Sequence, residues 1–158
     1  MEQIYDNILP FKHISEAANE AVTYIKRRKS HEIEPLKSRW KKFNDMCCGG
    51  IEPGCVYTIA GISGTGKSSF VNTLETDLIE LNPNKELIIL SFSFEMLSRS
   101  QIGRKLSNKL HQTTSELYSV SEEISDNELL LVEKTAKSFD NYPIYYIDDA
   151  ATVQKIGI

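Results

Sequence analysis

Residues 59–70 read IAGISGTGKSSF and contain a complete GxxxxGK[ST] pattern, which runs from Gly61 to Ser68. The glycines Gly61, Gly64 and Gly66 allow the backbone to turn sharply and leave its N–H groups uncovered. Uncovered N–H groups at the start of a helix bind phosphate oxygens. Lys67 is expected to reach the terminal phosphates, and the hydroxyl of Ser68 is expected to ligate Mg2+. This stretch therefore predicts a site for a nucleoside triphosphate rather than a turn that only links a strand to a helix.

The whole loop and the first residues after it are expected to contribute to this site, with a nucleoside triphosphate and Mg2+ as the ligands. The candidate nucleotide-binding residues are Gly61, Ser63, Gly64, Thr65, Gly66, Lys67, Ser68 and Ser69.

The segments around the loop alternate between strand and helix patterns. Residues 56–60, VYTIA, form a short apolar run after Pro53-Gly54, as expected of a buried parallel strand, and apolar residues then recur at helical spacing until the break at Asn82-Pro83. Residues 86–94 and 143–147 are two further predicted strands, and residues 98–110 and the stretch after Ser125 are predicted helices. This order indicates an α/β fold with a parallel sheet and flanking helices.

An amphipathic helix is predicted ahead of this core, over residues 15–29. Its apolar residues, such as Ala18, Val22 and Ile25, form one narrow stripe, and a basic run at 26–29 closes it. The basic run is interpreted as a solvated helix end in preference to a DNA contact. We expect two parts: residues 1–33 as this helix with a connector, and residues 34–158 as the α/β domain.

Composition favours no particular partner. The chain has 158 residues, 41% of them hydrophobic, which suits one compact domain, and its net charge of −4 provides no general basic surface for nucleic acid. The three cysteines lack metal-ligand spacing, and no window approaches the roughly eighteen apolar residues of a membrane span. We expect a cytoplasmic protein without a zinc site.

Glu95 is the first candidate for a hydrolytic carboxylate. It follows the predicted strand 86–94, and the carboxyl ends of strands in an open parallel sheet face the ligand crevice. From this position alone, a catalytic residue and a solvent-facing residue are equally good interpretations.

In these motifs the chain resembles a known family, the RecA-like C-terminal motor domain of DnaB-type replicative DNA helicases. The similarity is carried by the run LKSRWKKFNDMCCGGIEPGCVYTIAGISGTGKSSF, by SFSFEM and by YPIYYIDDAATVQKI. The resemblance implies ATP-driven translocation on single-stranded DNA and duplex unwinding by a hexameric ring. It also implies that Lys67 acts on the phosphates, that Ser68 holds Mg2+ and that Glu95 polarises the attacking water.

The resemblance also bears on the two ends of the sequence. It implies a linker helix that docks on a neighbouring subunit, which we favour slightly over a helix that folds back on its own domain. Asp148 ends an apolar strand as a Walker B aspartate would, but the family pattern places Walker B on a later strand, so we expect an incomplete motor core with weak or no hydrolysis of its own. The alternatives are a non-catalytic ATP-binding assembly or loader protein and a small P-loop kinase.

Overall fold

The computed structural model describes residues 11–93 and 96–148, and the chain divides into two compact units, Met1–Pro35 and Leu36–Ile158. The first unit contains the helix α1 (Ile14–Lys29), which begins one residue before its predicted start. None of its residues is buried, and Ile14 and Ile25 of the apolar stripe are well exposed. The amphipathic helix is thus confirmed as a helix, whereas its role as a linker and the domain boundary remain predictions.

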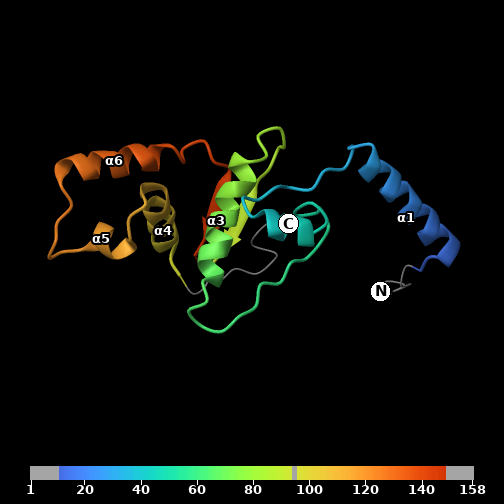
Figure 1. Ribbon diagram of the computed structural model, residues 1–158, viewed down its shortest axis with the longest axis horizontal. Helices are drawn as coiled ribbons and strands as arrows, with labels where there is room; N and C mark the ends of the chain where they lie inside the picture. The colour runs from blue at the N-terminus through green and yellow to red at the C-terminus, as the bar shows by residue number, and fades with distance from the viewer. Residues whose placement is uncertain (1–10, 94–95, 149–158) are drawn as a thin grey trace, which may run out of the picture. The chain divides into compact units, whose positions relative to one another are not determined.

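The second unit is a mixture of helices and strands (Figure 1). Its elements in chain order are α2 (Lys41–Met46), α3 (Lys67–Glu80), β1 (Ile89–Phe92), α4 (Ser98–Leu110), α5 (Thr114–Tyr118), α6 (Asp126–Lys137) and β2 (Ile144–Ile147). Helix α4 has the bounds that the sequence predicted. Helix α6 begins after Ser125, whose hydroxyl accepts from the Glu128 amide while the Glu128 carboxylate accepts from the Ser125 amide, so the predicted capping box is confirmed.

The two strands pair in parallel, with Ile89 opposite Ile144 and Phe92 opposite Ile147. Helices α4, α5 and α6 lie between them in the chain, so β1 and β2 are joined by a crossover connection, as a parallel pair requires. In Figure 1, α3 lies alongside this pair. The α/β class with a parallel sheet is therefore confirmed.

The strand predicted for residues 56–60 is wrong. This segment has no regular secondary structure, and Val56 is 94% exposed. A strand requires a neighbouring strand for its backbone N–H and C=O groups. Within the described part of the chain, β1 and β2 pair only with each other, so the apolar run before the loop finds no partner.

The interior of the second unit is unusually polar. Leu74 is the only apolar side chain that is buried among the described residues, whereas several buried side chains carry polar or charged groups, namely Ser38, Asn72, Glu75, Thr76, Asp77, Asn82, Gln101, Lys105 and Ser107. Phe70, at the start of α3, packs instead against Trp40, with ring centroids 4.5 Å apart, and against Phe43. Buried charges are tolerated only when they are paired, so the polar contacts of α3 decide how this unit is held together.

Candidate phosphate-binding site

The glycine-rich loop leads directly into α3. Gly64 and Gly66 have φ values of +82° and +85°, in the left-handed region that residues with a Cβ rarely adopt. Gly66 is the N-cap of α3, and no side chain caps the first turn. The first N–H groups of a helix have no partner inside the helix, so this end of α3 presents uncapped donors beside the loop.

The side chain of Lys67 folds back over the loop. Its ammonium group donates hydrogen bonds to the carbonyl oxygens of Gly61 at 2.8 Å and Ile62 at 2.9 Å. Thr65 also donates to the Ile62 carbonyl, from its hydroxyl, at 2.8 Å. The loop is therefore closed by its own polar groups, and the Lys67 ammonium remains partly exposed at its edge.

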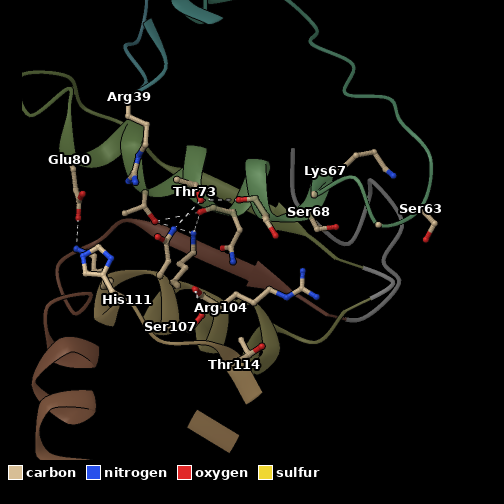
Figure 2. Close-up of a pocket in the computed structure, with 18 residues that line it drawn as sticks. Arg39, Ser63, Lys67, Ser68, Thr73, Glu80, Arg104, Ser107, His111 and Thr114 are labelled. Carbon is tan, nitrogen blue, oxygen red and sulfur yellow. Dashed lines mark hydrogen bonds and ion pairs between the residues drawn. The ribbon is translucent and has the colours of Figure 1, made fainter. Parts of the chain in front are cut away.

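The loop opens into a cleft of about 790 Å3 between α3 and α4 (Figure 2). Of the predicted nucleotide-binding residues, the structure brings six to this cleft, and Gly61 and Thr65 do not line it. The six are Ser63, Gly64, Gly66, Lys67, Ser68 and Ser69. The Ser68 hydroxyl has no hydrogen-bond partner among the described residues, which leaves its oxygen available to a metal ion.

The cleft carries more positive than negative charge. Five lysine and arginine side chains line it, against the single carboxylate of Glu80. They are Arg39, Lys67, Arg104, Lys105 and Lys109. A wall of this sign attracts anions such as phosphate groups.

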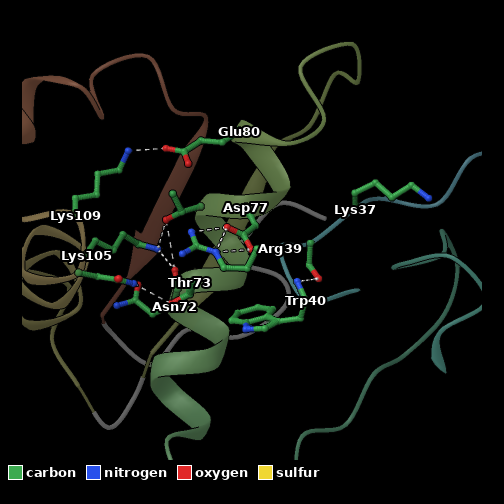
Figure 3. Close-up of polar contacts among 12 residues, drawn as sticks. Lys37, Arg39, Trp40, Asn72, Thr73, Asp77, Glu80, Lys105 and Lys109 are labelled. Atoms are coloured by element: carbon green, nitrogen blue, oxygen red, sulfur yellow. Dashed lines mark hydrogen bonds and ion pairs between the residues drawn. The ribbon is translucent and has the colours of Figure 1, made fainter. Parts of the chain in front are cut away.

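A buried polar network fixes α3 to α4 (Figure 3), and it also reaches both strands. The Lys105 ammonium lies 3.1 Å from Glu75 Oε2 and donates to the Asn72 carbonyl and, at 3.2 Å, to the Thr76 hydroxyl. Burial lowers the pKa of Lys105 although the negative charge of Glu75 opposes this shift. Asn72 adds a hydrogen bond of 2.9 Å from its side-chain amide to the Gln101 carbonyl.

Glu75 extends this network to the sheet. Its carboxylate accepts hydrogen bonds from the Ser91 hydroxyl on β1 at 2.7 Å and from the Tyr146 hydroxyl on β2 at 3.1 Å. Burial, and then the charge of Glu75, raise the pKa of Tyr146. One carboxylate therefore connects the helix that follows the loop with α4, β1 and β2.

A second ion pair anchors the far side of α3. Asp77 is 1% exposed and accepts hydrogen bonds from the Arg39 backbone at 2.9 Å and from Arg39 Nε at 2.8 Å. The hydrogen bond from the guanidinium raises the pKa of Arg39. This pair joins the segment before α2 to α3.

The two acidic candidates have different outcomes. Glu95 lies outside the described residues, as does Asp149. The Asp148 carboxylate accepts hydrogen bonds from the Ser98 amide at 2.9 and 3.1 Å, which places it at the start of α4. A carboxylate is favourable there because it complements the positive end of the helix dipole.

The buried polar contacts between α3 and α4 were not predicted from the sequence. A signal was present, because Asn72, Glu75 and Thr76 recur at a spacing of three and four residues, which places them on one face of a helix. The apolar spacing of this helix does not reveal these contacts. The partners on α4, Gln101 and Lys105, show the same four-residue spacing.

Together these features define an α/β protein in which a phosphate-loop sequence precedes a helix beside a parallel strand pair. Residues 35–158 match the family described as DnaB-like helicase C terminal domain, and the chain belongs to this family. The resemblance inferred from the motifs is thereby confirmed. A search among curated proteins found no matching relative. None of the described helices has both the length and the apolar character needed to cross a membrane.

Proposed function

We propose that this chain forms the ATP-binding part of a DnaB-like replicative helicase. The observation that carries the proposal is the GxxxxGK[ST] loop, which enters α3 through an uncapped helix start at the edge of a positively charged cleft. In the complete assembly, ATP hydrolysis would drive a hexameric ring along single-stranded DNA and separate the duplex.

On phosphate binding, the Lys67 ammonium would exchange its carbonyl acceptors for phosphate oxygens. The ammonium now donates to two loop carbonyls, and a bound triphosphate offers charged acceptors in their place. The Lys67 ammonium already donates as a charged group, and a phosphate oxygen adds the attraction of opposite charges, which a carbonyl oxygen lacks. The loop thus holds Lys67 close to where the phosphates would lie, so little reorganisation is needed on binding.

Ser68 is the residue that would hold Mg2+, whose charge would offset that of the phosphates. We assign the hydrolytic role to Glu95. Its carboxylate would take a proton from water as the water oxygen attacks the γ-phosphorus, and the bond from that phosphorus to the bridging oxygen of ADP would break. This assignment rests on the family resemblance and on the position of Glu95 after β1 in the sequence.

Equilibrium titration with ATP in the presence of Mg2+ tests the proposal. We expect Lys67→Ala to weaken ATP binding by at least about tenfold, because a charged hydrogen-bond donor is lost. Lys42→Ala is the matched control, since Lys42 is an exposed lysine on α2 outside the cleft. Equal ATP affinity in Lys67→Ala and Lys42→Ala would contradict the proposed site.

A further inference from the structure

The five basic side chains in the cleft differ in whether they are paired with a carboxylate. Arg39, Lys105 and Lys109 are paired with carboxylates, namely those of Asp77, Glu75 and Glu80. Lys67 and Arg104 have no carboxylate partner among the residues that the structure describes. The charge of Lys67 is accounted for by the phosphate loop, which leaves the charge of Arg104 unexplained.

The contacts between α3 and α4 show where Arg104 lies along the cleft. Asn72 contacts Gln101 near the start of α4, and Glu80 contacts Lys109 near its end. These two contacts give α3 and α4 the same direction, and the helices cross between them, because Thr73 also contacts Asn108 while Thr76 contacts Lys105. The start of α4 consequently lies toward the phosphate-loop end of α3.

Side-chain direction then brings Arg104 closer to the loop. Long side chains on a helix point back toward its N-terminus and cover the preceding turn. Figure 2 shows the Arg104 side chain extended along the cleft with its guanidinium on the side of Ser68. The neighbouring residue Lys105 is held in the buried network, so the position of Arg104 on α4 is fixed by its packing.

We infer that Arg104 is a second phosphate-binding cation, which contacts a phosphate oxygen of the nucleoside triphosphate held by the loop. This inference rests on the proposed function and deepens it. A guanidinium presents planar paired donors that match phosphate oxygens, whereas an ammonium acts as a point charge. Lys67 would thus approach the phosphates from the loop, and Arg104 would approach them from α4.

The test compares Arg104→Ala with Arg99→Ala, a matched control because Arg99 is exposed on the same helix but does not line the cleft. Binding is measured by titration with Mg2+-ATP and, in parallel, with inorganic tripolyphosphate. We expect Arg104→Ala to weaken both ligands by about tenfold or more, because a charged donor is lost. Arg99→Ala should bind as the wild type, Arg104→Lys should recover part of the affinity, and thermal unfolding should be the same in all variants.

Three outcomes would overturn the inference. Wild-type ATP affinity in Arg104→Ala, together with weakened binding in Lys67→Ala, would remove Arg104 from the site and leave the proposed function standing. A loss of ATP affinity without a loss of tripolyphosphate affinity would mean that Arg104 contacts the nucleoside and not the phosphates. Undiminished ATP binding in Lys67→Ala would remove the proposed site itself and, with it, the role of Arg104.

Discussion

The Lys105 ammonium lies 3.1 Å from the Glu75 carboxylate, and the two side chains are only 5% and 9% exposed. Because Glu75 also binds Ser91 and Tyr146, this ion pair joins α4 to α3 and to both strands. The helix that carries Lys67 and Ser68 at its start is thus held to α4 and to the sheet largely by this buried charge pair, and only one apolar side chain of the helix, Leu74, is buried.

Lys105→Met should therefore destabilise the fold strongly, although methionine fills a similar volume. Removal of one partner leaves the Glu75 charge buried and uncompensated, which costs about 3–5 kcal/mol. Urea denaturation followed by circular dichroism measures the free energy of unfolding. Lys41→Ala breaks an ion pair that is exposed to solvent and should change this free energy little. A loss for Lys105→Met as small as that for Lys41→Ala would show that the pair does not hold the helices together.

Glu80 should make stability depend on pH on the acid side. Partial burial would raise the pKa of Glu80, but hydrogen bonds from Lys109 and Tyr142 outweigh burial and lower the pKa below its ordinary value of 4.5. A carboxyl whose pKa is lower in the folded state contributes stability above the unfolded pKa, and this contribution is lost as the pH falls through the folded value. The free energy of unfolding should therefore be higher for the wild type than for Glu80→Gln. This difference should be constant above about pH 4.5 and should shrink below it. A difference that did not vary between neutral and acid pH would contradict this role.

A comparison of Gly66→Ala with Gly54→Ala tests whether the backbone conformation at Gly66 is needed for ATP binding. Gly66 and Gly54 have φ values of +85° and +75°, and neither has a neighbouring atom that an added Cβ would meet. Alanine at either position should cost about 1–2 kcal/mol of stability, because only the backbone conformation opposes the Cβ. Gly54 lies outside the cleft, so Gly54→Ala should keep the wild-type affinity for ATP, whereas Gly66→Ala should weaken it in the same titration. Equal ATP affinity in the two variants would show that the conformation at Gly66 is not needed for binding.

The Asp148 carboxylate accepts hydrogen bonds from the first amide of α4, and a substitution can distinguish this role from metal binding. Asp148→Ala should lower the free energy of unfolding by about 1 kcal/mol, because a helix-start amide loses its side-chain acceptor. Asp148→Asn keeps an acceptor and should lose less. Magnesium titrations at fixed ATP should give the wild-type midpoint in both variants, and a large shift of that midpoint would assign Asp148 to the metal instead.

Glu95→Gln tests the hydrolytic assignment. Glutamine preserves the size of the side chain but cannot take a proton from water, so ATP turnover should fall while ATP affinity stays at the wild-type value. Phosphate release and equilibrium binding are measured on the same preparation. The comparison requires a measurable wild-type rate, and a residual turnover that is equal in the wild type and in Glu95→Gln would refute the role of this residue.

Several features of the fold follow from short stretches of sequence. The bounds of α4, the capping box of Ser125 and Glu128, and sharp turns at Gly64 and Gly66 were predicted from residues within a few positions of one another. Helices and turns satisfy their backbone groups locally, so the nearby sequence contains most of the information that specifies them. The same holds for the phosphate loop, whose pattern occupies eight consecutive positions.

Other features depended on groups far apart in the chain. The apolar run at 56–60 looked like a strand, yet a strand forms only where a second strand accepts its hydrogen bonds. Likewise, the pairing of Glu75 with Lys105, the hydrogen bonds from the first amide of α4 to Asp148 and the place of Arg104 in the cleft each join segments that are 30 or more residues apart or lie on different helices. The sequence alone thus determined the glycine-rich loop pattern, the four longer helices α1, α3, α4 and α6, and the family, whereas the short helices α2 and α5 were not predicted. Only the tertiary structure decided which charges are paired inside and which side chains face the cleft, because these depend on the packing of distant segments.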